Sequence, residues 1–241
     1  MAHRNELKRS KKKQKKKDFT PFIIIGVLVL VVVVVIVLTS LNANRTPENP
    51  NLAEVVDPEL AIASTTDGLT MGDPNAPVKV IEFADYQCPG CGSYWATLEP
   101  QIIADYVNTG KVFFTFSPFS FVGSFVENNP WDESIKSAEA AYCANEVGKF
   151  WEYRSYLFGN QQGENQGAFS RNRLIEMADR LSLDKKAFTE CLDSGKYNQT
   201  VLDANDYAVE NGISYTPSFL INGQIVGGGD VLAAIETAVN E

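Results

Sequence analysis

The stretch IEFADYQCPGCGSYW, residues 81–95, decides how the rest of the chain is interpreted. Its two cysteines, Cys88 and Cys91, are separated by a proline and a glycine, and Glu82 lies six positions upstream. Cysteines at this spacing can form a redox centre, half of a metal site or a structural crosslink. The local pattern and the composition of the whole chain discriminate among these possibilities.

The local pattern places the cysteines at the start of a helix. Residues 78–83, VKVIEF, form a short apolar run that predicts a buried strand. Pro89 is favoured at a first helical position, so Cys88 would cap the helix and receive its free N–H groups and its positive dipole end. Both effects favour the thiolate and lower the pKa of Cys88. Cys91, one turn further on, would be shielded and could resolve a mixed disulfide.

The dipeptide between the cysteines tunes the reduction potential. A stabilised thiolate makes the disulfide form a stronger oxidant, by about 30 mV for each pKa unit. Gly90 contributes no side-chain donor or charge. Any stabilisation of the Cys88 thiolate is therefore expected to come from the backbone and the helix dipole.

Two further candidates for the site are each open to two interpretations. Glu82 is either a buried acid with a raised pKa, able to exchange a proton with Cys91, or an exposed residue at a strand end. The Thr216-Pro217 bond either adopts the cis form and brings backbone groups against the cysteines, or marks an ordinary strand edge. The pattern alone does not decide either case.

The charge of the chain is unevenly distributed. Of its 21 Lys/Arg and 30 Asp/Glu residues, nine basic and two acidic ones fall in residues 1–19. The part from residue 40 onward carries the other 12 basic and 28 acidic residues, a net charge of −16. Phosphate contacts need clustered cations, so this acidic part is not a nucleic-acid-binding domain.

A long apolar run follows the basic tail. Residues 22–38 comprise 17 positions without a charge, at the short end of what crosses a bilayer as a helix. A cleaved signal peptide is the alternative, but the run is long for one and SLNANR is a weak cleavage site. We therefore expect an uncleaved anchor at 21–40, a basic cytoplasmic tail at 1–20 and an acidic domain on the outer side. The polar residues 41–68 are expected to form a linker.

The predicted location and the residue inventory limit the chemistry. All four cysteines would lie on the exported side, where an even number of thiols is consistent with two disulfides. The chain has one histidine, His3, in the basic tail. The exported part therefore has no Ser-His-Asp or Cys-His catalysis, and no zinc or haem held by histidine.

The order of predicted elements indicates an α/β core with a helical insertion. The strand at 78–83 is followed by the cysteine helix and by a second strand, KVFFTF, at 111–116. Helical segments then occupy most of the chain to residue 211, with Ser170 and Asp184 as candidate caps. An Asn-Gly hairpin at 218–226 and a helix at 230–239 complete the chain.

These residues resemble a known family. GDPNAPVKVIEFADYQCPGC and YTPSFLINGQIVGG, separated by a helical insert, are similar to the DsbA-like thiol-disulfide oxidoreductases of the thioredoxin superfamily. The likeness is greatest to the membrane-anchored forms of bacteria that lack a periplasm. It covers residues 69–241 and implies a thioredoxin-like fold with a helical insert at about 128–211. It also implies that the redox-active disulfide replaces any cofactor or metal.

The resemblance assigns roles to the site residues. It implies that Cys88 is the nucleophile, Cys91 the resolving thiol and Glu82 the buried acid. It implies that Pro217 is cis and that Thr216 offers backbone groups to a bound peptide. The family often has a histidine after the proline, where this chain has Gly90, so weaker oxidising power is expected.

The remaining cysteines, Cys143 and Cys191, are expected to form a structural disulfide in the oxidising compartment. Free thiols or a second redox pair are the alternatives. We expect the enzyme to donate disulfides to exported unfolded or reduced proteins and to be reoxidised by a quinone-linked membrane partner. The alternatives are a disulfide reductase or isomerase on the same fold, a zinc site made by the four cysteines, and a binding module without catalysis.

Overall fold

The computed structural model describes residues 30–35, 49 and 51–241 of the chain. Residues 30–35 are helical and belong to a unit separate from the domain that follows. Most of the anchor expected at 21–40, and all of the basic tail, lie outside the described residues. No helix among the residues described has the length and apolar character needed to cross a membrane.

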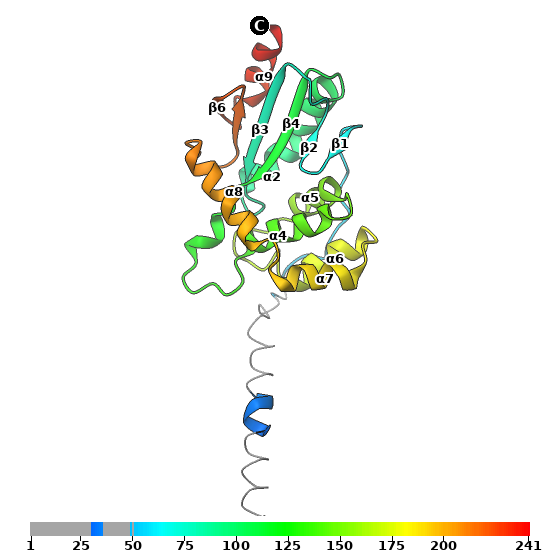
Figure 1. Cartoon of the computed structure of the whole chain (residues 1–241), viewed down its shortest axis with the longest axis vertical. Helices are drawn as coiled ribbons and strands as arrows, with labels where there is room; N and C mark the ends of the chain where they lie inside the picture. The colour runs from blue at the N-terminus through cyan, green and yellow to red at the C-terminus, as the bar shows by residue number, and fades with distance from the viewer. Residues whose placement is uncertain (1–29, 36–48, 50) are drawn as a thin grey trace, which may run out of the picture. The chain divides into compact units, whose positions relative to one another are not determined.

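A mixed sheet forms the centre of the domain (Figure 1). Among the described residues it has six strands, in the order β1-β2-β4-β3-β5-β6. Their bounds are Thr66–Asp67 (β1), Thr70–Met71 (β2), Val78–Ala84 (β3), Val112–Pro118 (β4), Ser218–Ile221 (β5) and Gln224–Gly227 (β6). β3 and β4 are parallel, and every other neighbouring pair is antiparallel. The strands and the hairpin expected from the sequence are present.

The two parallel strands need a crossover connection, and a run of helices supplies it. These helices are α2 (Pro89–Thr97), α3 (Glu99–Ile102) and the π-helix η1 (Ile103–Val107). β3 is buried along most of its length, as expected for a strand at the centre of a sheet. It ends at Ala84, and α2 begins five residues later, at Pro89. The cysteine pair therefore lies where the central strand meets the crossover helix.

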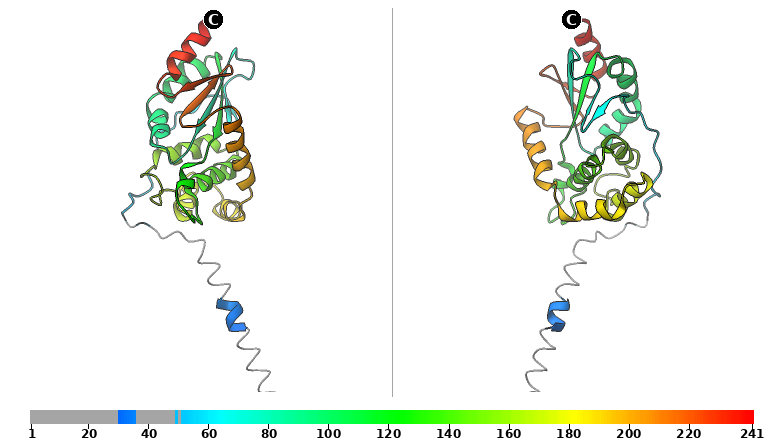
Figure 2. Two further views of the ribbon diagram at one scale, coloured as in Figure 1. Left: turned by 90° about the vertical axis from the view of Figure 1, so that its left-hand side faces the viewer. Right: turned by 45° about the vertical axis from the view of Figure 1, so that its right-hand side comes forward.

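The expected helical insertion lies between β4 and β5. It begins with the short 3₁₀ helix η2 (Val122–Phe125) and continues through five α-helices. They are α4 (Glu133–Asn145), α5 (Phe150–Gly159), α6 (Arg171–Arg180), α7 (Lys185–Ser194) and α8 (Asn198–Glu210). Helices α4 to α7 form a block at one end of the sheet, and the last helix, α9 (Val231–Asn240), lies toward the other end (Figures 1 and 2).

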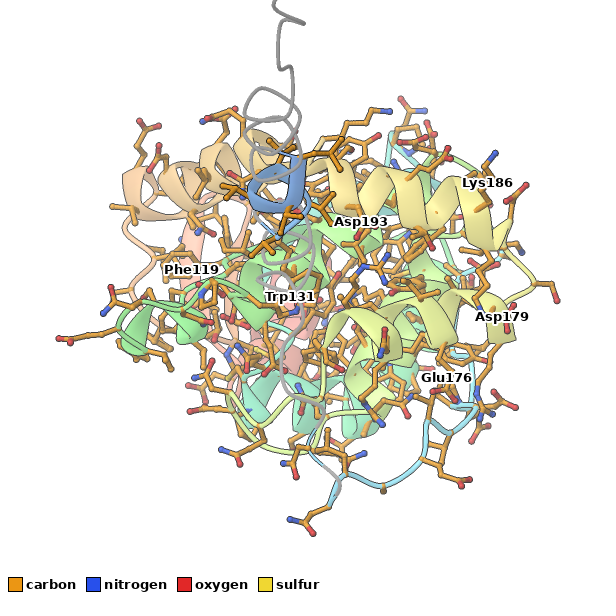
Figure 3. All side chains as sticks on the ribbon, turned by 90° about the horizontal axis from the view of Figure 1, so that it is seen from below. Phe119, Trp131, Glu176, Asp179, Lys186 and Asp193 are labelled. Atoms are coloured by element: carbon orange, nitrogen blue, oxygen red, sulfur yellow. A yellow bond between two sulfur atoms is a disulfide. The ribbon has the colours of Figure 1, made fainter. Side chains whose placement is uncertain are left out.

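Helices α6 and α7 present a charged outer face (Figure 3). Glu176 and Asp179 lie on α6, and Lys186 and Asp193 on α7. Trp131, labelled in the same view, is buried and donates from Nε1 to the carbonyl oxygen of Phe169, 2.9 Å away. The face is typical of helices that bury one side against a core and solvate the other.

The expected linker at 41–68 needs a correction in its described part. Thr66 and Asp67 form the edge strand β1, and the segment before them packs on the domain. Val55 and Ala63 are buried, and the backbone of Val56 exchanges two hydrogen bonds with Asn160. The polar composition of this segment suggested a spacer without contacts to the domain. The segment is instead held through its backbone, which the side-chain amide of Asn160 can bind whatever the local sequence is.

Of the two expected helix caps, Asp184 makes capping hydrogen bonds and Ser170 does not. Asp184 caps α7, since its carboxylate accepts from the N–H groups of Lys186 and Ala187. Ser170 occupies the N-cap position of α6, but its hydroxyl makes no capping bond. The sequence therefore predicted the N-cap position of Ser170 correctly, but the side chain of Ser170 makes no hydrogen bond to the helix end.

Candidate active site

Cys88 is the N-cap residue of α2, and Pro89 is the first residue of the helix. The backbone of Cys88 is extended, and its carbonyl oxygen accepts from the N–H groups of Cys91 at 3.1 Å and Gly92 at 3.2 Å. Proline at this position loses no hydrogen bond and has the helical φ angle already. Cys88 is half-buried, whereas Cys91 is fully buried. Both are free thiols in the structure.

The two sulfur atoms differ sharply in acidity. The pKa of Cys88 is lowered from 9.0 to about 6, chiefly because the Cys91 thiol donates a hydrogen bond to its thiolate. Partial burial opposes this effect, and Thr216 and the backbone of the first helical turn support it. Burial raises the pKa of Cys91 well above its usual value, and the charges of Cys88 and Glu82 raise it further. One thiolate is thus available at neutral pH, and it is the more exposed one.

The peptide bond between Thr216 and Pro217 is cis, and it lies against the cysteine pair. The Cys88 Sγ atom is 3.5 Å from the carbonyl oxygen of Thr216. A Cβ atom added to Gly90 would lie 3.2 Å from Cδ of Pro217 and 3.7 Å from Cys88 Sγ. The absence of a side chain at Gly90 therefore lets the proline approach the first turn of α2 closely.

Glu82 is completely buried, which excludes the interpretation as an exposed residue at a strand end. It receives a hydrogen bond at 2.5 Å from Nη2 of Arg154, on α5. Arg154 also binds Glu99, at the start of α3, through both Nη atoms at 2.7 Å. One buried guanidinium is thus shared by two buried carboxyl groups, and one oxygen of Glu82 has no partner among the described residues.

Burial dominates the titration of Glu82. It raises the pKa of Glu82 from 4.5 to about 8, although the charge of Arg154 acts in the opposite direction. The negative charge of Glu99 adds to the rise. Glu82 is therefore largely protonated at neutral pH, and it is close enough to Cys91 for its charge to affect that thiol.

Arg154 is held in an aromatic box. Its guanidinium carbon lies 4.6 Å from the ring centre of Phe116, 4.8 Å from that of Phe158 and 5.2 Å from that of Trp151. Aromatic faces stabilise a buried cation electrostatically. The sequence pattern did not single out Arg154 or Glu99, because nothing in their local surroundings indicates that they meet Glu82.

A second buried carboxylate, Asp85, fixes the loop between β3 and α2. Its Oδ2 accepts from the N–H groups of Phe121 and Val122, at 2.8 and 2.9 Å. Its Oδ1 accepts from the N–H of Gln87 and from the hydroxyl of Ser134, both at 2.8 Å. Burial raises its pKa to about 6 despite these bonds. Asp85 thereby ties the cysteine loop to the insertion, a role that the sequence did not reveal.

Cys143 and Cys191 are joined by a disulfide between α4 and α7. Their Cα atoms are 6.0 Å apart, at a sequence separation of 48. Because two of the four thiols are bonded to each other, a zinc site made by all four cysteines does not fit the structure. Within the described part of the chain, no cluster of three or more histidine, cysteine or acidic residues could hold a metal ion.

The thioredoxin family model matches residues 64–241. The chain belongs to the thioredoxin family. A probable disulfide bond formation protein D of Bacillus cereus is 27% identical over 158 residues, which cover 65% of this chain and 70% of that protein. The disulfide bond formation protein D of Bacillus subtilis is 28% identical over 162 residues, covering 65% and 68%.

Solved structures agree on the fold of this family member. The crystal structure of oxidised BdbD from Bacillus subtilis has a TM-score of 0.64 and 23% identity, covering 76% of this chain and all of that one. The structure of alpha-DsbA1 from Wolbachia pipientis has a TM-score of 0.60 and 21% identity, covering 74% and 94%. The chain is a DsbA-like thiol-disulfide oxidoreductase, a type of enzyme that uses a redox-active cysteine pair instead of an external cofactor.

Proposed function

We propose that this enzyme donates disulfides to exported proteins through Cys88 and Cys91. The main support is the contrast between the two sulfurs, with the pKa of half-buried Cys88 lowered to about 6 and that of buried Cys91 raised. A stabilised Cys88 thiolate favours the reduced enzyme, so the oxidised enzyme gives up its disulfide readily. The relatives named as disulfide bond formation proteins point the same way.

The reaction would proceed through a mixed disulfide. A client thiolate attacks Sγ of Cys88 in the oxidised enzyme, the bond between the two enzyme sulfurs breaks, and Cys91 leaves with the electron pair. A second client thiolate then attacks the client sulfur of the mixed disulfide and releases the Cys88 thiolate. The client gains a disulfide and loses two electrons, which the enzyme keeps as a dithiol.

Glu82 would handle the proton of the buried sulfur. Since its pKa is raised to about 8, it is largely protonated at neutral pH and can supply a proton as the Cys91 thiolate forms. It can take the proton back when the disulfide is restored. Arg154 and Glu99 would hold Glu82 in place and set the balance between its two forms.

Thr216 and the cis Pro217 would bind the client next to Cys88. The carbonyl oxygen of Thr216 lies 3.5 Å from the sulfur, so a peptide that reaches Cys88 also reaches this backbone. An extended client segment could pair with it as an added strand. Pro89 and Gly90, both exposed, leave the approach to Cys88 open.

The location of the enzyme is part of the proposal. The basic tail and the uncharged run at residues 22–38 support a single-pass anchor in a bacterial cell membrane, with the N-terminus in the cytoplasm and the catalytic domain outside. Clients would be exported unfolded or reduced proteins. Each cycle leaves a dithiol, so a membrane partner that passes two electrons to a quinone would restore the disulfide.

A reductase or isomerase acting through the same residues is the second candidate. Gly90 favours it, because the dipeptide gives the Cys88 thiolate no side-chain donor and so limits the oxidising power. Disulfide donation and disulfide reduction require different equilibrium reduction potentials of the Cys88-Cys91 pair. An enzyme more reducing than glutathione would run as a reductase.

Two measurements on the exported fragment test the proposal. The oxidised enzyme is mixed with a reduced, unfolded client, and recovery of client activity is followed. The equilibrium with glutathione gives the potential in the same preparation. We expect stoichiometric transfer and a potential above that of glutathione. Absence of transfer together with a potential below glutathione would contradict the donor function and favour the reductase.

A further inference from the structure

Three consecutive residues with amide side chains directly follow helix α5, and they bind different parts of the molecule. Asn160 exchanges two hydrogen bonds with the backbone of Val56, at 2.7 and 2.9 Å. Gln162 does the same with the backbone of Ala53, at 2.6 and 3.0 Å. These two residues hold the N-terminal segment of the domain. Gln161, between them, is turned toward the active-site loop.

Gln161 binds the backbone of the nucleophile itself. Its Nε2 atom donates to the carbonyl oxygen of Tyr86 at 2.6 Å and to that of Cys88 at 3.0 Å. The same carbonyl of Cys88 also accepts from the N–H groups of Cys91 and Gly92, in the first turn of α2. Gln161 therefore provides a third donor at the peptide group where the loop becomes a helix.

We propose that Gln161 is a positioning residue for disulfide exchange, whose amide fixes the backbone of Cys88 so that the first turn of α2 presents its N–H groups to the sulfur. Gln161 does not touch the reacting atoms. It acts through the orientation of the Cys88 peptide group, whose carbonyl oxygen it binds. A fixed first turn keeps the N–H groups of the helix start close to the anionic sulfur.

The space around Gly92 gives independent evidence that the amide of Gln161 occupies a defined position. A Cβ atom added to Gly92 would overlap the amide of Gln161, with Oε1 as its nearest atom. Any larger residue at this position would push the amide away from the two carbonyls. Glycine in a helix interior costs roughly 0.5–1 kcal/mol relative to alanine, so the close approach of Gln161 gives a physical reason for its presence.

The inference takes the role of Cys88 as nucleophile from the proposed function, and the test separates the two. The reduced wild-type protein and a Gln161→Ala variant are titrated by thiolate absorbance, and their potentials are measured against glutathione. We expect the proton affinity of Cys88 to rise about two- to threefold in the variant, at the low end of what one hydrogen bond contributes, because Gln161 bonds the backbone and not the sulfur. The disulfide form should become correspondingly less oxidising.

Gln162→Ala is the matched control. It removes two hydrogen bonds from the same turn without touching the active-site loop. We expect a small loss of thermal stability and an unchanged pKa of Cys88. If the segment after α5 only supported the fold in general, Gln161→Ala and Gln162→Ala would change the pKa of Cys88 equally. Equal effects of the two variants on this pKa would therefore overturn the inference.

Gly92→Ala completes a double-mutant cycle. Alone it should raise the pKa of Cys88 as Gln161→Ala does, because the new methyl group displaces the amide. In the Gln161→Ala background it should have little further effect, since the amide is already gone. If both variants keep the wild-type pKa while the wild type still transfers disulfides, the positioning role is wrong and the proposed function stands.

Discussion

The two cysteine pairs of this protein show how surroundings decide what a pair of thiols does. Cys88 and Cys91 lie three residues apart at the start of one helix, and both are free in the structure. Cys143 and Cys191 are 48 residues apart on two helices of the insertion, and they are bonded. The first pair is surrounded by groups that shift its titration, among them Glu82 and Thr216.

The two cysteine pairs differ in their ability to exchange disulfide bonds with other proteins. Cys88 caps a helix, is partly accessible and has a pKa lowered to about 6, so it can trade bonds with another sulfur near neutral pH. Cys143 is buried in the interface between α4 and α7 and Cys191 is half-buried there. The second pair is therefore expected to link the helices without taking part in the reaction.

The largest effect should come from Cys88→Ala. Removal of the accessible sulfur should reduce disulfide transfer to the uncatalysed rate, because the mixed disulfide forms at that atom. Cys143→Ala/Cys191→Ala should transfer disulfides at nearly the wild-type rate. Client reactivation with both variants in parallel tests this. Loss of transfer in the second variant, with the fold intact, would place the insertion disulfide in the reaction.

The insertion disulfide should matter for stability. Cys143→Ala/Cys191→Ala releases a loop of 48 residues, and the chain-entropy model predicts a loss of about 4 kcal/mol in the free energy of unfolding. Denaturant unfolding of the variant and the wild type measures it. A loss well below 1 kcal/mol would mean that the helices α4 and α7 hold together without the crosslink.

Glu82 should make stability fall as pH rises. Its pKa is raised from 4.5 to about 8 by burial, so the protonated form is favoured in the folded state. The stabilisation is complete below pH 4.5 and is lost as pH rises toward 8. In the oxidised protein, where Cys88 and Cys91 do not titrate, Glu82→Gln should flatten this dependence. An unchanged profile in the variant would show that Glu82 is ionised throughout.

In the reduced protein, Cys88 adds a contribution of the opposite sign to that of Glu82. The pKa of Cys88 is lowered from 9.0 to about 6 in the folded state. The stability that this shift contributes is present in full above pH 9 and is lost as pH falls through 6. We therefore expect the stability difference between reduced and oxidised protein to shrink on acidification. Parallel unfolding curves at three pH values measure it, and a difference independent of pH would refute it.

The smallest effect is expected from Thr216→Val. The substitution keeps the shape of the side chain and removes a buried hydroxyl that has no hydrogen-bond partner among the described residues and that favours the Cys88 thiolate when it turns toward the sulfur. That pKa should rise by about one unit or less, since a single hydrogen bond contributes about 0.5–1.5 kcal/mol. Thiolate titration of the variant checks this, with Ser218→Ala as a control at a neighbouring hydroxyl that bonds to Tyr215 instead. A drop in the pKa would contradict it.

Local signals predicted the parts of the site that local structure builds. The apolar run before the cysteines became β3, Pro89 opened α2, and the Asn-Gly pair made the last hairpin. These features depend on a few adjacent residues. The fold class followed from their order along the chain.

The rest of the site depends on contacts between distant segments. Arg154 meets Glu82 across 72 positions of sequence, and Gln161 meets Cys88 across 73. A buried arginine and a glutamine at a helix end look like surface residues in the sequence, since their partners come from other elements. The segment before β1 was misjudged for a similar reason, because Asn160 and Gln162 hold it by its backbone.

The central claim is that one sulfur, held at a helix start, is an anion at neutral pH. Titration of the thiolate absorbance in reduced wild-type protein, with Cys88→Ala as the blank, measures this directly. The account predicts a transition at about pH 6 that the variant lacks. A first transition near the ordinary value of 9.0 for this thiol would contradict it.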